Sequence, residues 1–205
     1  MTPSRLVLAS SSAYRRMLLA RFGISFACRP PRVDESRRAD ESPWNMVARL
    51  AEAKARSVAK DFENVLVIGS DQCAVIDREP VGKPGSRQAN IEQLKVMAGR
   101  WIEFLTGVCL LNTESGHCQI DTVTFAVQLR RLSEQQIAAY VDREQPFDCA
   151  GGFKSEGLGI SLFECMRGDD PTALVGLPLI RLREMLEAEG VDVLQPPESR
   201  SGGAT

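Results

Sequence analysis

The segment Leu6–Arg16 constrains the fold more than any other part of the chain. It begins with the aliphatic run Leu6–Ala9, continues through the serines at 10–12, and reaches Arg15 and Arg16 where a helical pattern opens. A strand that leads through a polar turn into a helix brings backbone N–H groups, hydroxyls and guanidinium groups together, and these groups can bind a phosphate. The alternative is a serine-capped helix with arginines on its outer face, and the segment alone favours neither.

The composition predicts a globular protein that does not bind nucleic acid polymers. The chain has 205 residues, 43% of them hydrophobic, which is enough to bury a full core. Its 25 basic residues are balanced by 27 acidic ones, so it lacks the positive field that drives non-specific nucleic-acid binding. The six cysteines are scattered without metal-ligand spacing. Scattered cysteines of this kind suit a protein in a reducing compartment. No apolar run in the sequence is long enough to cross a bilayer. We therefore expect a cytoplasmic protein with no membrane partner.

Apolar periodicity predicts an α/β fold with a mixed sheet. Helical spacing occurs in five segments, residues 15–22, 42–62, 86–99, 133–143 and 178–189. Short aliphatic runs predict strands at residues 24–27, 65–69 and 160–163, and the β-rich runs Trp101–Leu111 and Cys118–Leu132 predict a long hairpin. We assign residues 1–194 to one domain. Residues 195–205 contain Pro, Ser and Gly and almost nothing apolar, which predicts a disordered tail.

Three acidic segments are candidates for catalysis or metal binding. Asp71 follows the buried run Val65–Ser70, so we expect it just beyond the carboxyl end of a strand, where α/β proteins hold reactive groups. A carboxylate there can bind a divalent metal or take a proton from water. The alternative is a turn aspartate, which so apolar a preceding strand disfavours. Glu35 lies in a polar loop, and on its own it is better explained as a surface residue. The pair Asp169-Asp170 lies in a predicted turn, and on its own it is better explained as part of that turn.

Two lysines and a further glutamate are candidate ligand contacts. Lys54 interrupts the apolar face of the second predicted helix, so it either reaches outward from the edge of the core or points into a cleft. Lys83 lies between Gly82 and Pro84 in a tight loop that holds the ammonium group in a defined place or simply on the surface. Glu156 lies in a glycine-lined loop that a flat ligand can approach. The single histidine is beside the hairpin turn, which argues against a Ser-His or Cys-His hydrolase.

Six short motifs occur in a fixed order along the chain. They are Leu8-Ala9-Ser10-x-Ser12-x-x-Arg15-Arg16, Val33-Asp34-Glu35, Arg49-Leu50-Ala51-x-x-Lys54, Gly69-Ser70-Asp71-Gln72, Gly82-Lys83-Pro84 and Gly176-Leu177-Pro178-Leu179. Together they resemble the Maf family of nucleoside triphosphate pyrophosphatases. The resemblance implies an elongated, two-lobed α/β fold of the Maf/ITPase type, often dimeric. It also implies metal-dependent hydrolysis between the α and β phosphates, which yields a nucleoside monophosphate and pyrophosphate.

The resemblance further implies a role for each matching side chain. Asp71 matches the family's general base, and Asp71 and Glu35 match the carboxylates that hold a divalent cation, Mg²⁺ or Mn²⁺. Four side chains match the groups that hold the triphosphate in the family, namely Ser10, Arg15, Lys54 and Lys83. We expect the hydroxyl of Ser12, in the same turn as Ser10, to be a further contact.

Three positions predict the preferred base. Tyr14, Gln72 and Glu156 resemble the branch of the family that prefers 7-methyl-GTP, whose guanine is positively charged. An aromatic face attracts a flat cation, and Glu156 can accept hydrogen bonds from the guanine N1–H and exocyclic amine. The chain departs from this branch at Tyr14, where Trp is usual, and at Ala13, where Pro is usual. The departure at Tyr14 predicts weaker stacking and a broader specificity, and the departure at Ala13 predicts a looser turn with a different loop shape.

Three alternatives stay open from the sequence. The first is a nucleotide-binding regulator of cell division that acts by contact without catalysis. The second is a phosphatase that removes the terminal phosphate. The third is a pyrophosphatase of other canonical or modified nucleotides. The products formed from a nucleoside triphosphate separate these classes.

Overall fold

A computed structural model describes residues 5–195, and within them seven strands form one mixed sheet. The sheet order is β2-β1-β3-β5-β6-β7, with β4 paired to β3. The strands are β1 (Arg5–Leu8), β2 (Phe26–Cys28), β3 (Val65–Ile76), β4 (Glu79–Val81), β5 (Trp101–Asn112), β6 (Cys118–Leu129) and β7 (Phe163–Arg167). Strand β1 is parallel to β2 and β3, and the other pairs are antiparallel. The expected α/β class is confirmed.

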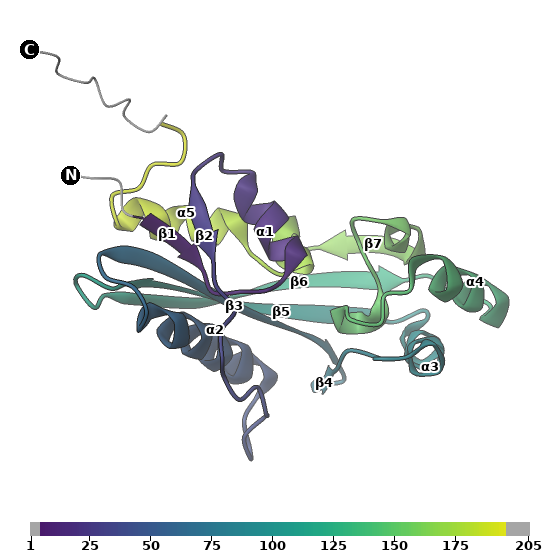
Figure 1. The fold of residues 1–205 in the computed structure, drawn as a ribbon. Coiled ribbons are helices and arrows are strands. Elements are labelled where there is room, and N and C mark those ends of the chain that lie inside the picture. The colour runs from purple at the N-terminus through teal and green to yellow at the C-terminus, as the bar shows by residue number, and fades with distance from the viewer. Residues whose placement is uncertain (1–4, 196–205) are drawn as a thin grey trace, which may run out of the picture.

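Helices cover the sheet in two groups, which gives the molecule its elongated form (Figure 1). The α-helices are α1 (Ala13–Ala20), α2 (Pro43–Ala59), α3 (Arg87–Met97), α4 (Glu134–Glu144) and α5 (Leu179–Ala188). The 3₁₀ segments are η1 (Ala150–Gly152), η2 (Leu158–Leu162) and η3 (Pro171–Val175). Helices α1, α2 and α5 lie at one end and α3 and α4 at the other. At the first end α1 and α5 cover one face of the sheet over one apolar cluster, and α2 covers the opposite face over another. Helices α3 and α4 share a third cluster. This arrangement fits the expected two lobes.

Serine caps begin four of the helices, as their positions in the sequence predict. The hydroxyls of Ser12, Ser42, Ser86 and Ser133 each accept a hydrogen bond from the backbone N–H three residues later. Ser133 and Gln136 form a reciprocal capping box, in which the Gln136 side chain accepts from the Ser133 N–H. These bonds satisfy N–H groups that the first helical turn leaves without partners.

The hairpin prediction is confirmed, and the prediction of a strand at residues 160–163 is wrong. Strands β5 and β6 pair continuously from Trp101↔Gln128 to Leu111↔Cys118. Residues 158–162 instead form η2, and the strand begins at Phe163. Gly159 explains the turn, because a Cβ there would lie 2.3 Å from the Lys154 carbonyl oxygen. The chain therefore folds back on itself before it extends.

Strand β3 is longer than the sequence suggested, which corrects the position of Asp71. The strand continues through Asp71 to Ile76 because β5 pairs with it from Leu66 to Val75. Its parallel neighbour β1 ends earlier, with Leu8 opposite Ile68. Asp71 thus lies within β3, not beyond its carboxyl end, but it does lie past the end of β1.

Two glycines let α2 pack directly on the sheet. A Cβ on Gly69 of β3 would lie 2.0 Å from the Ala51 carbonyl oxygen, and one on Gly107 of β5 would lie 2.2 Å from that of Val47. Such distances are impossible for real side chains, so only glycine permits this approach. The close packing places Lys54, on the next turn of α2, against the middle of β3.

The assignment of residues 1–194 to one domain stays a prediction. Most of the expected tail, residues 196–205, lies outside the described residues. No helix in the described part of the chain is long and apolar enough to span a membrane.

Candidate functional site

An open cleft of about 900 Å³ lies where β1 ends, between α1, the middle of β3 and the turn after β4. A smaller cavity of about 120 Å³ adjoins it. The cleft is lined by nine of the ten candidate residues, namely Ser10, Ser12, Tyr14, Arg15, Glu35, Lys54, Asp71, Gln72 and Lys83. The tenth, Glu156, lines the smaller cavity together with Tyr14, Arg15, Gln72 and Lys83. Side chains from five separate segments therefore meet at one place, as the sequence predicted.

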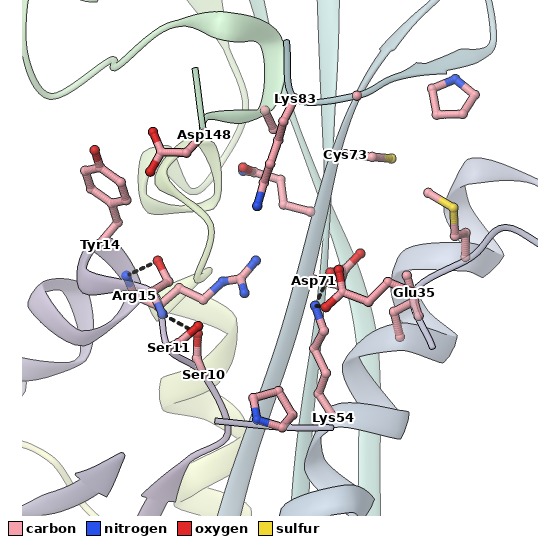
Figure 2. Close-up of a pocket in the computed structure, with 18 of the residues that line it drawn as sticks. Ser10, Ser11, Tyr14, Arg15, Glu35, Lys54, Asp71, Cys73, Lys83 and Asp148 are labelled. Carbon is pink, nitrogen blue, oxygen red and sulfur yellow. Dashed lines mark hydrogen bonds and ion pairs between the residues drawn. The ribbon is translucent and has the colours of Figure 1, made fainter. Parts of the chain in front are cut away.

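One lysine joins the two candidate catalytic carboxylates. Lys54 Nζ lies 2.6 Å from Asp71 Oδ1 and 2.8 Å from Glu35 Oε1 (Figure 2). Lys54 and Asp71 are only 5% and 7% exposed, whereas the Glu35 side chain is 60% exposed. Partial burial opposes ionisation of Glu35, but its hydrogen bond and charge interaction with Lys54 prevail and lower its pKa. Both carboxylates thus face the cleft from one side.

Arg15 and Lys83 point into the space opposite these carboxylates (Figure 2). Arg15 Nε donates to the Gly176 carbonyl oxygen at 2.8 Å, and that oxygen also accepts from Ser70 Oγ at 2.8 Å. This anchor directs the end of the guanidinium group towards the cleft. Burial lowers the pKa of Arg15 although Asp71 and Glu35 act against the shift. A guanidinium group nevertheless keeps its charge in proteins, so Arg15 remains a cation suited to phosphate.

The serine-rich turn combines both interpretations of its sequence. Ser10 Oγ accepts from the Ser12 N–H at 3.1 Å, and Ser12 Oγ accepts from the Arg15 N–H at 3.3 Å. Ser12 therefore caps α1, as the alternative interpretation of a serine-capped helix predicted. Both serines also line the cleft, and their hydroxyl hydrogens remain donors for an anion.

Tyr14 and Glu156 meet in the smaller cavity beside an acidic residue that sequence reasoning missed, Asp148. In Figure 2, Tyr14 and Asp148 lie on the opposite side of the cleft from Asp71 and Glu35. Burial, followed by the proximity of Cys149, Asp148 and Glu156, raises the pKa of Tyr14, so its hydroxyl stays neutral. The cavity therefore combines an aromatic ring and the carboxylates of Asp148 and Glu156 with the cationic groups of Arg15 and Lys83, which also line it.

Gln72 lines both cavities, and its side-chain amide also binds neighbouring chain segments. Its Nε2 donates to the carbonyl oxygens of Ala173 at 2.6 Å and Leu174 at 3.1 Å, and to Thr106 Oγ1 at 3.1 Å. The bonds to Ala173 and Leu174 hold η3 against β3. Because Leu174 and Val175 line the smaller cavity, Gln72 shapes that cavity through η3.

The turn interpretation of Asp169-Asp170 agrees with the structure. Asp170 Oδ1 accepts from the Thr172 N–H at 2.9 Å, and its Oδ2 accepts from the Ile180 N–H at 2.8 Å. Asp170 therefore caps η3 and is not aimed at the cleft. Within residues 5–195, no group of three or more His, Cys, Asp and Glu side chains is arranged to hold a metal ion by itself.

Two further lining residues lacked a clear sequence signal. Arg37 follows Glu35 by two residues in the same loop, and Cys73 follows Asp71 by two residues on the same face of β3. Burial and the neighbouring Asp71 raise the pKa of Cys73 to about 12, so it remains a neutral thiol. Side chains alternate between the two faces of a strand, so a prediction that β3 continues past Asp71 would have placed Cys73 on the same face as Asp71.

A mixed α/β sheet with a cleft that joins carboxylates, lysines and an arginine defines an anion-binding class of protein. The family model described as Maf-like protein matches residues 5–189, and the chain belongs to the Maf family. It is 52% identical over 188 residues to the 7-methyl-GTP pyrophosphatase of Pseudomonas syringae pv. syringae (strain B728a), which covers 92% of this chain and 98% of that protein. It is 53% identical over 192 residues to the 7-methyl-GTP pyrophosphatase of Alcanivorax borkumensis, covering 94% and 97% of the two chains.

A solved structure also resembles the fold. The Staphylococcus aureus Ham1 protein aligns with a TM-score of 0.51 and 16% identity, over 91% of this chain and 100% of that one. At this identity the likeness concerns the fold alone, and it agrees with the expected Maf/ITPase-like architecture.

Proposed function

We propose that this protein is a nucleoside triphosphate pyrophosphatase that hydrolyses the bond between the α and β phosphates and prefers 7-methyl-GTP. The observation that carries the proposal is one cleft in which Asp71 and Glu35 face Arg15 and Lys83. The names of relatives about 50% identical over nearly the whole chain support the same activity.

In this proposal Asp71 is the general base. It accepts a proton from a water molecule, whose oxygen bonds to the α phosphorus while the bond from that phosphorus to the α–β bridging oxygen breaks. Arg15, Lys54 and Lys83 stabilise the negative charge that develops on the departing pyrophosphate. Ser10 and Ser12 donate hydrogen bonds to phosphate oxygens without adding charge.

The donor set of the cleft fits a divalent cation. Lys54 contacts Oδ1 of Asp71 and Oε1 of Glu35, and each carboxylate has a second oxygen. Mg²⁺ and Mn²⁺ prefer hard oxygen ligands and are often held by one or two carboxylates together with substrate phosphates. Asp71 and Glu35 would hold the cation, which when bound neutralises phosphate charge and polarises the phosphorus.

The smaller cavity supports the preference for a methylated guanine. A ring that carries a positive charge is attracted by the face of Tyr14 and by the charges of Glu156 and Asp148. Neutral guanine has the same hydrogen-bonding edge but lacks the charge. Discrimination by a few such contacts is limited to about 1–3 kcal/mol each.

A panel of canonical and methylated nucleoside triphosphates with Mg²⁺ or Mn²⁺ tests the proposal. We expect pyrophosphate and the monophosphate as products, fastest from 7-methyl-GTP, and no turnover after chelation of the metal. Orthophosphate with a diphosphate would instead indicate a terminal phosphatase. Binding without any product at high enzyme concentration would indicate the non-catalytic regulator.

We also propose a cytoplasmic homodimer. The six cysteines, which all lie in the described part of the chain, are free thiols, and this supports a reducing compartment. The resemblance to the family supports the dimer, and the molecular mass in solution, measured by light scattering, tests it.

A further inference from the structure

The loop between β2 and α2 carries Glu35 and has neither helix nor strand of its own. In Figure 1 it lies at the bottom of the view, below the first turn of α2. Glu35 of this loop contacts Lys54, the partner of Asp71, at 2.8 Å. An exposed glutamate on such a loop needs something else to hold the backbone in place.

That support comes from a pair of side chains outside the cleft, Arg49 and Glu41. Arg49 Nε donates to Glu41 Oε1 at 2.5 Å, and Arg49 Nη2 donates to Glu41 Oε2 at 2.7 Å. The same Nη2 donates to the Ser36 carbonyl oxygen at 3.1 Å. Ser36 directly follows Glu35, so this guanidinium group ties the backbone beside Glu35 to the body of α2.

Glu41 completes the arrangement from within the loop. Its Oε2 also accepts from the Arg38 N–H at 3.1 Å, and its own carbonyl oxygen accepts from Arg37 Nε at 2.9 Å. The Glu41 and Arg49 side chains are 9% and 19% exposed, so solvent screens this two-bond ion pair less than a surface one. The hydrogen bonds from Arg49 lower the pKa of Glu41 to about 2.

We propose that Arg49 and Glu41 are positioning residues that hold the loop in the shape in which Glu35 reaches Lys54 and the cleft. Arg49 lies five residues before Lys54 on α2, so one helix fixes the lysine and, through the loop, its second carboxylate partner. The inference rests on the proposed pyrophosphatase function. It adds two residues that act through Glu35 and touch neither substrate nor metal.

Arg49→Lys tests the geometry of the pair, because lysine keeps the charge but cannot make two parallel bonds to one carboxylate. We expect kcat for pyrophosphate release to fall about 10- to 100-fold with a smaller change in KM. The matched control is Arg87→Lys, which breaks a similar two-bond pair with Asp142, at 2.6 and 2.9 Å, on the exposed surface of α3 and α4. That control should leave kcat unchanged.

A double-mutant comparison distinguishes positioning from a general structural role. In a Glu35→Gln background, adding Arg49→Lys should lower kcat no further, because the residue through which it acts is already altered. Independent, multiplicative losses would overturn the inference. If Arg49→Lys fails to fold, Glu41→Gln takes its place in the same comparison, since it removes the charge from the other side of the pair.

Limited trypsin digestion supplies a readout that does not depend on catalysis. Arg37 and Arg38 are cleavage sites within the loop, and faster cleavage there in Arg49→Lys than in the wild type is the expected result. Equal rates would contradict the inference even if the wild type releases no pyrophosphate. An inactive wild type with the expected cleavage pattern would refute the proposed function and leave the role of the pair in the loop intact.

Discussion

Lys54 Nζ contacts Asp71 Oδ1 at 2.6 Å and thereby joins α2 to β3 at the buried floor of the cleft. A buried ammonium group and a buried carboxylate are each costly to desolvate alone, and each compensates the other. The contact also holds the Asp71 carboxylate in place at the cleft, across from Arg15 and Lys83. Removal of either partner should therefore affect both the chemistry and the stability.

Replacement Asp71→Asn should abolish most turnover and preserve the fold. An amide of the same shape cannot accept the proton from water, so we expect kcat to fall about 10²- to 10⁴-fold. Lys54 keeps Glu35 as a charged partner, which limits the loss of stability. Steady-state pyrophosphate release and thermal unfolding measure the two effects. Asp142→Asn, which alters an exposed ion pair with Arg87, is the control and should remain active. Near-wild-type turnover in Asp71→Asn would remove Asp71 from its proposed role.

Replacement Tyr14→Ala should reduce discrimination between 7-methyl-GTP and GTP. Loss of the aromatic face removes about 0.5–2 kcal/mol of cation–π attraction, equivalent to about a 2- to 30-fold fall in the ratio of kcat/KM values. Tyr14→Phe keeps the ring and loses only the hydroxyl, so it should retain most of the preference. An unchanged ratio in Tyr14→Ala would refute the stacking role.

Periodicity and capping were enough to predict the hairpin and the serine-capped helices, because local contacts decide those elements. The length of β3 was not predictable in this way. Its continuation past Gly69 depends on pairing with β5, about 40 residues further along the chain, and Ser70 and Asp71 are not residues that by themselves favour a strand.

The site shows the same division between local and distant effects. Ten of the residues that line the cleft and the adjoining cavity were named from the sequence and the resemblance to the family, whereas the partners of those residues were not. The bonds from Gln72 to η3 join residues about 100 positions apart, and no local pattern could have shown that its amide faces backbone carbonyls. Asp148 was missed for a similar reason, since it reaches Tyr14 only through the folded chain.

Replacement Gly69→Ala should destabilise the protein and displace the site together. The new Cβ would lie 2.0 Å from the Ala51 carbonyl oxygen, so α2 must move away from the sheet. We expect a loss of about 1–3 kcal/mol in the free energy of unfolding, as for other overpacked cores. Because Lys54 moves with α2, kcat should fall as well. Gly82→Ala is the control for stability, as its Cβ meets nothing within 4 Å. Equal stability of the two variants would show that the helix adjusts without cost.

The ion pair between Glu41 and Arg49 predicts how stability changes in acid. The pKa of Glu41 is about 2 in the folded protein, lowered first by the hydrogen bonds from Arg49, against an ordinary value of 4.5. Because the folded value is the lower one, the pair contributes its full stability above pH 4.5 and loses it as the pH falls towards 2.

Glu41→Gln should therefore be less stable than the wild type at neutral pH, and the difference should shrink between pH 4.5 and 2. Urea unfolding of both proteins across this range measures it, and subtraction removes the contributions of all other carboxylates. A difference that stays constant over the range would mean that Glu41 does not titrate with the lowered pKa. Its contact with Arg49 would then be too weak to hold the loop that carries Glu35.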